Sequence, residues 1–199
     1  MNENRWIKDF VSCILFCLVL ASCAPEKTRP SAANAERYVA RIINWGKTKG
    51  IVSTGTGFFV TPDTLVSNAH VVEGADSLLV AYRNANSVQL VSASVKHVDS
   101  ERDLAVITAA GMHGTPLGIP QDPVQAAEDV WAVGYPGIAD NGEEIEKLVR
   151  DELAGSRDEI DSGKFKKELS FEKYSNIFGA TISKGTVIKL ATGTWETGT

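Results

Sequence analysis

Residues 55–72 read GTGFFVTPDTLVSNAHVV and decide the fold, because two short apolar strands joined by a Pro-Asp turn lead directly to a histidine at position 70. A later stretch, RDLAVI at residues 102–107, places Asp103 at the start of another apolar strand. His70 and Asp103 lie 33 positions apart, which leaves room for two or three further strands. We therefore expect the two side chains to share a site at the edge of a small β-barrel.

Together these stretches resemble the bacterial trypsin-like peptidases of the HtrA (Deg) type, over about residues 51–190 and with one insertion. The resemblance implies an all-β, chymotrypsin-like double β-barrel that acts on polypeptides. By the family's Ser/Thr-x-x-His-Val pattern, His70 is the general base and Asp103 is the acceptor that fixes the tautomer of the imidazole. No cofactor is implied, because the triad works without metal.

The sequence lacks the third member of the triad. In the family's chain order a serine within Gly-x-Ser-Gly-Gly follows a strand pair like the one that residues 181–187 resemble, yet no such motif occurs before Thr199. Ser183 is not directly followed by a glycine, and Ser162 is followed by one glycine where the motif has two. We therefore expect the chain as given to be inactive.

Two explanations remain open. The chain is either a truncated form of a serine endopeptidase or a natural pseudoenzyme, a lipoprotein that binds peptides or a partner in the cell envelope. Truncation is favoured, because the sequence stops midway through the predicted second barrel. A purely structural role is a third alternative.

Short apolar runs punctuated by turn residues are typical of a small antiparallel barrel. We assign residues 37–115, with His70 and Asp103, to a first barrel and residues 116–199 to an incomplete second one. The expected strands are residues 38–43, 57–60, 64–67, 77–82, 88–91, 93–98, 104–107, 130–136, 176–183 and 185–190.

A highly charged segment, residues 140–168, is predicted to be a helical insertion in the second barrel. Asn141 with Glu144 can cap a helix. The apolar residues that then fall on one helical face are Ile145, Leu148, Val149 and Leu153. Two roles are open for this helix: a lid or partner-binding element beside the cleft, or a surface helix whose apolar stripe packs on the barrel. The second is favoured.

The amino terminus predicts export. Residues 10–21 form an apolar run after Arg5 and Lys8, shorter than the roughly 20 residues that span a bilayer, and so indicate a signal peptide. The run ends in LASC, residues 20–23, which resembles a bacterial lipoprotein box and implies lipidation of Cys23. An ordinary secretory signal, with Cys23 incidental, is the alternative.

These readings give a signal peptide at residues 1–23 and a polar linker at residues 24–36. The lipoprotein resemblance implies a lipid anchor on the periplasmic side of the cell envelope, with the outer membrane favoured because Ala24 is not an aspartate. All three cysteines lie within residues 1–23, so no internal disulfide is expected in the mature domain.

Several other functions are excluded or disfavoured. The formal net charge of −5, without a concentrated basic patch, argues against nucleic acid as a partner. Ser170 and Lys173 match the Ser-x-x-Lys of penicillin-binding enzymes, but the accompanying Lys-Thr-Gly is absent. His97 and His113 lack the spacing of metal ligands and are expected at the surface. The sequence predicts neither oligomeric state nor side-chain preference.

Overall fold

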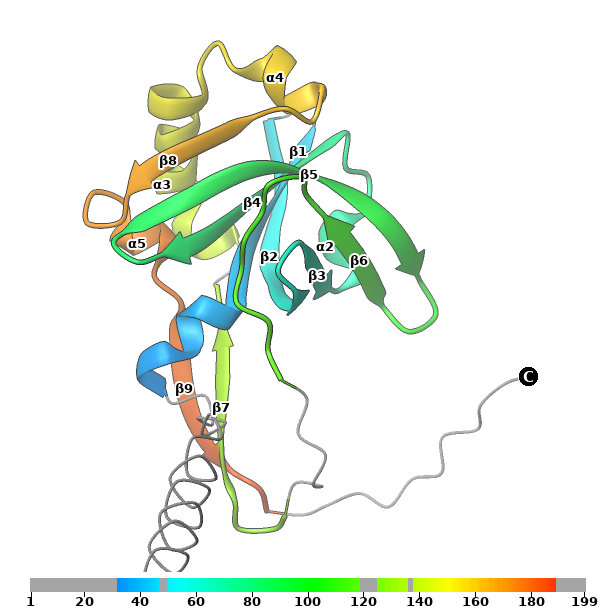
Figure 1. Ribbon diagram of the computed structural model, residues 1–199, viewed down its shortest axis with the longest axis vertical. Helices are drawn as coiled ribbons and strands as arrows, with labels where there is room; N and C mark the ends of the chain where they lie inside the picture. The colour runs from blue at the N-terminus through cyan, green and yellow to red at the C-terminus, as the bar shows by residue number, and fades with distance from the viewer. Residues whose placement is uncertain (1–31, 47–49, 119–124, 136–137, 189–199) are drawn as a thin grey trace, which may run out of the picture. The chain divides into compact units, whose positions relative to one another are not determined.

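The first part of the chain forms a closed ring of antiparallel strands (Figure 1). The protein is seen here as a computed structural model that describes residues 32–46, 50–118, 125–135 and 138–188. The strands of the ring are β1 (Val39–Gly46), β2 (Gly50–Thr61), β3 (Thr64–Ser67), β4 (Ser77–Asn84), β5 (Ser87–Asp99) and β6 (Leu104–Thr108). Their order is β4-β1-β2-β3-β6-β5, and pairing of β4 with β5 closes the ring. With a separate second sheet, this barrel confirms the predicted all-β, double-barrel class.

β5 is one long strand where the sequence predicted two. Residues 87–93 of β5 pair with β4, and residues 94–99 pair with β6. The β5–β6 register shifts between Val95 and His97, and an irregularity of this kind bends a strand. The change of partner comes before this irregularity, between Ala93 and Ser94. One strand therefore pairs with both neighbours, which closes the barrel, and its end leads to the turn that holds Asp103.

Two hydrophobic clusters cover opposite faces of β1, β4 and β5, and this explains their nearly continuous apolar runs. Every residue of β1 is buried. The cluster inside the barrel includes Phe59, Leu65 and Ile107, none of which has exposed surface. The cluster on the outer face joins the barrel residues Ile43 and Leu79 to apolar side chains from the second half of the chain.

The predicted insertion supplies much of that outer cover. Its elements are α3 (Ile138–Leu148), the π-helical turn η2 (Val149–Leu153), α4 (Arg157–Asp161) and β8 (Lys166–Ser170). Ile145, Leu148 and Leu153, from the predicted apolar face, are buried in the outer cluster. The stripe thus packs on the barrel.

The start of the helix differs from the prediction. α3 begins at Ile138, so Asn141 lies inside the helix and is not its cap. A local capping signal fixes a helix start only to within a few residues when the preceding chain can also continue the helix.

β8 ties the insertion to the first barrel. It pairs antiparallel with β5, with Leu169 opposite Val88, and adds a seventh strand to that sheet (Figure 1). The domain boundary between residues 115 and 116 stays a prediction. The packing does not follow that boundary, because residues from both sides of it share the outer hydrophobic cluster.

The second sheet consists, in the described part of the chain, of β7 (Asp129–Gly134) and β9 (Thr181–Thr186). The prediction of one strand over residues 176–183 was wrong in its first half, where α5 (Ser175–Phe178) forms a helical turn. Ile177 and Phe178 are buried in the outer cluster, so a short apolar run serves here as a core helix, which periodicity alone cannot distinguish from a strand.

The amino-terminal predictions fall mostly on residues that the structure does not describe. Cys23, the signal peptide at residues 1–23 and most of the linker at residues 24–36 lie outside the described residues. The 3-10 helix η1 (Ala32–Tyr38) begins within the predicted linker. Of the helices that the structure describes, none combines the length and apolarity needed to cross a bilayer.

Candidate active site

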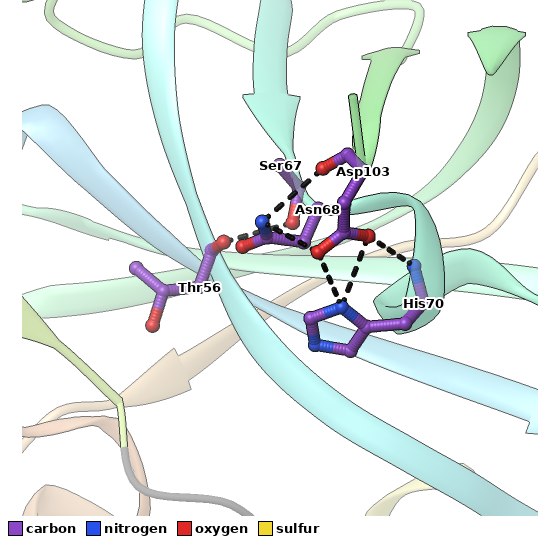
Figure 2. A network of polar contacts seen from close by, with 5 residues as sticks. All are labelled: Thr56, Ser67, Asn68, His70 and Asp103. Atoms are coloured by element: carbon purple, nitrogen blue, oxygen red, sulfur yellow. Dashed lines mark hydrogen bonds and ion pairs between the residues drawn. The ribbon is translucent and has the colours of Figure 1, made fainter. Parts of the chain in front are cut away.

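Two neighbouring strands bring His70 and Asp103 to the same edge of the barrel. β3 ends at Ser67 and is followed by α2 (Ala69–Val72), which carries His70. β3 and β6 pair antiparallel with Ser67 opposite Ala105, so the end of β3 lies beside the start of β6. Asp103 immediately precedes β6. The segment that follows β3 and the residue that precedes β6 therefore lie side by side, as Figure 2 shows for His70 and Asp103.

The Asp103 carboxylate faces the Nδ1 atom of the His70 ring. Nδ1 lies 2.8 Å from Oδ2 and 3.0 Å from Oδ1, and the backbone N–H of His70 donates to Oδ1 at 3.0 Å. An ionised carboxylate can only accept hydrogen bonds, so Nδ1 must carry the ring proton. In the neutral imidazole this leaves the lone pair on Nε2, the atom that can take a proton from a third group.

Asp103 is ionised at neutral pH. The hydrogen bond from the His70 backbone N–H, followed by those from the His70 and Asn68 side chains, holds the pKa of Asp103 below its ordinary value. The side chains of His70 and Asp103 are 67% and 46% exposed. A pair this exposed contributes little to stability. Its physical effect is to orient the ring and set its tautomer.

The turn before β6 holds Asp103 in an unusual conformation. Its φ is 53°, in the left-handed region, which aspartate tolerates better than most residues. Arg102 braces the turn, because its backbone N–H donates to Oδ1 of Asp99 at 3.0 Å and its guanidinium contacts Oδ2 at 2.8 Å. The carboxylate of Asp103 therefore projects from a defined turn.

A hollow of about 670 Å³ opens beside the pair. It lies between α2 with its following loop on one side and the second half of β5 with the β5–β6 turn on the other. Its lining residues are Ala69, His70, Val72, Glu73, Gly74, Ala75, Val95, Val98, Ser100 and Asp103. Val95 and Val98 are each more than a third exposed, which gives the hollow an apolar wall next to the imidazole. Within the part of the chain that the structure describes, no residue of the insertion lines the hollow.

Among the described residues, no hydroxyl is hydrogen-bonded to Nε2 of His70. Ser183 pairs with Ala132 in the second sheet, and the hydroxyl of Ser162 donates to the Glu159 carbonyl. Neither serine lines the hollow.

The remaining motifs stay apart from this site. Ser170 and Lys173 are close, but Lys173 contacts the Glu152 carboxylate at 2.8 Å. That contact raises the pKa of Lys173, which is the opposite of what a catalytic base needs. His97 and His113 are exposed, as expected.

Sequence reasoning missed Asn68, whose side chain contacts Asp103. Its position immediately before α2 is a usual place for a helix-capping asparagine, so the sequence held no signal for a contact with the aspartate.

A barrel that carries a His–Asp pair at the junction of its third and sixth strands belongs to the class of serine peptidases with two β-barrels. The comparison with known families gives the same result. Residues 55–194 match the family described as "Trypsin-like peptidase domain", and the chain belongs to that family.

Individual relatives include two bacterial proteases. Serine protease Rv3671c of Mycobacterium tuberculosis is 32% identical over 108 residues, which are 54% of this chain and 26% of the relative. The magnetosome formation protease MamE of Paramagnetospirillum magneticum is 35% identical over 94 residues, which are 45% of this chain and 13% of the relative. The chain thus matches about a quarter or less of the length of these relatives.

Among solved structures, the active form of the Rv3671c protease from M. tuberculosis is similar to this chain. It is 28% identical with a TM-score of 0.47, and the match covers 54% of this chain and 46% of that one.

Proposed function

We propose that this chain is part of a serine endopeptidase that cleaves polypeptides, with His70 as the general base and Asp103 as the acceptor that orients it. The observation that carries this proposal is the contact of both Asp103 oxygens with Nδ1 of His70, at 2.8 and 3.0 Å. Membership of the trypsin-like peptidase family supports it.

The chemistry follows from the tautomer. Nε2 of His70 removes the proton from a serine hydroxyl while the serine oxygen bonds to the carbonyl carbon of the substrate. The Asp103 carboxylate stabilises the resulting imidazolium, which then gives the proton to the leaving amine as the C–N bond breaks. Water repeats the sequence on the acyl-enzyme and releases the carboxylate product. The serine would be supplied by the longer protein of which this chain forms part, because the relatives extend well beyond the matched region.

The substrates that we propose are unfolded or exposed polypeptide segments. The hollow beside His70 supports this, because it is open to solvent next to the base and has an apolar wall formed by Val95 and Val98. An extended segment could place an apolar side chain there and its carbonyl near Nε2.

For location, we propose the periplasmic side of the bacterial cell envelope, with an HtrA-like lipoprotein anchored through Cys23. The support is the apolar run at residues 10–21 and the LASC sequence at residues 20–23, which resembles a lipoprotein box. Labelling cells with an alkyne fatty acid and finding no label on the protein, or equal label on Cys23→Ser, would exclude the anchor.

A second candidate is a catalytically inactive lipoprotein that uses the hollow to bind peptides or an envelope partner. One observation favours it: in the described part of the chain, Nε2 of His70 has no hydroxyl partner. In such a protein His70 and Asp103 would shape the binding surface and would not take part in catalysis.

Sequencing the gene past codon 199 distinguishes the two candidates. An open frame that encodes Gly-x-Ser-Gly-Gly supports the endopeptidase, and a stop codon supports the binding protein. The longer protein should then react with an organophosphonate serine probe. His70→Ala should abolish this labelling, whereas His97→Ala, a change of an exposed histidine outside the hollow, should leave it intact. Equal labelling of both variants would exclude His70 as the base.

A further inference from the structure

Asn68 lies between β3 and α2, two residues before His70. An asparagine at the amino-terminal end of a helix usually caps it, by accepting a hydrogen bond from a backbone N–H in the first turn. Here the side chain makes no capping hydrogen bond. Its amide is turned toward Asp103 instead (Figure 2).

The amide of Asn68 holds Asp103 at two points. Nδ2 donates to the backbone carbonyl of Asp103 at 3.2 Å and to its Oδ2 at 3.1 Å. The first contact restrains the backbone of Asp103, whose φ of 53° lies in the left-handed region that non-glycine residues adopt infrequently. The second contact restrains rotation of the carboxylate.

That rotation matters for the His70 ring. Oδ1 already accepts from the backbone N–H of His70, while Oδ2 makes the shorter contact with Nδ1, at 2.8 Å. Oδ2 has no other donor among the described residues than Nδ1 and the Asn68 amide. Without the amide, this oxygen could turn from the ring toward water, because the side chain of Asp103 is 46% exposed.

We propose that Asn68 is a positioning residue, which acts through Asp103 to keep the proton on Nδ1 of His70 and the lone pair on Nε2. The role of Asn68 in catalysis rests on the proposed function. Its effect on the proton position concerns only the contacts among Asn68, Asp103 and His70. Glu73 is the other titratable group lining the hollow, and Asp99 and Arg102 on the turn pair with each other. None of these replaces the amide donor.

The test is NMR spectroscopy of this chain with labelled histidine and aspartate. The ¹⁵N shifts of His70 report the tautomer, and the ¹³C shift of the Asp103 carboxyl reports its pKa. Asn68→Ala should lower the population of the Nδ1–H tautomer and move the pKa of Asp103 upward, because one of its hydrogen-bond donors is lost. Asn86→Ala, an exposed change in the β4–β5 turn, should alter neither.

A second variant separates positioning from helix capping. Aspartate is as good a capping residue as asparagine but has no amide donor. Asn68→Asp should therefore also lower the Nδ1–H population. If it behaves like the wild type while Asn68→Ala does not, the residue is a cap and the proposal is wrong.

A double-mutant cycle tests whether the effect passes through Asp103. In an Asp103→Ala background, adding Asn68→Ala should leave the tautomer ratio of His70 unchanged. The proposal would be overturned if Asn68→Ala changed the tautomer ratio of His70 equally in the wild-type and Asp103→Ala backgrounds, or changed it in neither. Amide spectra of each variant verify folding, and an unfolded Asn68→Ala is replaced by Asn68→Asp in the cycle. None of these measurements needs peptidase activity, so an inactive longer protein would contradict only the proposed function.

Discussion

The hydroxyl oxygen of Thr56 accepts a hydrogen bond from the backbone N–H of Tyr135 at 2.8 Å, and this bond joins the first barrel to the end of β7. Tyr135 is buried, so its N–H has no ready access to water. Gly134 beside it fits closely, because a Cβ there would lie 3.0 Å from the same oxygen. The Thr56 side chain therefore contributes a hydrogen bond to the junction between the barrel and the second sheet, beside the Arg41 guanidinium that lies over the Tyr135 ring.

Thr56→Val should destabilise the protein by about 1–3 kcal/mol, since it keeps the size of the side chain and leaves a buried N–H without an acceptor. Urea unfolding followed by circular dichroism measures the change. Thr56→Ser keeps the oxygen and should retain most of the stability. If the two variants were equally stable, the hydrogen bond would not hold the junction.

Gly114→Ala should destabilise the barrel, because the added methyl group would lie 2.1 to 2.3 Å from atoms of the buried Phe59 ring. Overpacking of this kind costs about 1–3 kcal/mol. The matched control is Gly118→Ala, whose added methyl group meets nothing within 4 Å and should change stability by less than about 0.5 kcal/mol. Thermal unfolding of the pair provides the comparison, and equal melting temperatures would show that the ring moves aside.

The Glu152 carboxylate should make the free energy of unfolding decrease as the pH is lowered. Hydrogen bonds from Lys173, Tyr174 and Lys167 lower its pKa from 4.5 to about 2. Because the carboxyl is more acidic in the folded than in the unfolded chain, its contribution is full above pH 4.5 and is lost as the pH falls toward 2.

Glu152→Gln should therefore flatten the fall of unfolding free energy over that range. Glu146→Gln, at an exposed carboxylate that lies 3.9 Å from Arg150, is the control and should keep the fall. Urea unfolding at a series of pH values measures the free energy of unfolding of each variant. If this free energy fell in parallel with pH for the wild type and Glu152→Gln, Glu152 would not be the group responsible.

Leu148→Ala should destabilise the protein by about 2–5 kcal/mol, as expected for a fully buried leucine. A helix that served only as a movable lid would tolerate this change. Lys147→Ala, on the exposed side of the same helix, should have little effect. Denaturant unfolding measures both, and a loss below about 1 kcal/mol for Leu148→Ala would show that the insertion does not stabilise the barrel.

The candidate pair could be found from the sequence because its determinants are local. His70 follows a strand that the pattern TLVS predicts to the residue, and Asp103 immediately precedes the strand LAVIT. Antiparallel pairing of these two strands then brings the side chains together. The contact between Asn68 and Asp103 could not be predicted, because a capping asparagine and a positioning asparagine have the same sequence context.

The misassigned segment at residues 176–183 shows the same limit. Asn176 to Phe178 has the composition of a strand, but packing against the outer face of the barrel buries Ile177 and Phe178 in a helical turn. A short apolar run can satisfy either structure, and the partner surface selects one.

The amino-acid sequence by itself determined the barrel class, the family and the pairing of His70 with Asp103, because each follows from residue patterns along a few neighbouring strands. It did not determine that β5 is one continuous strand. Only the tertiary structure decided that the charged insertion packs on the barrel and adds β8 to its sheet. The physical reason is that the outer faces of β1, β4 and β5 are apolar, and which distant segment covers them depends on shape and burial in three dimensions, which no local pattern records.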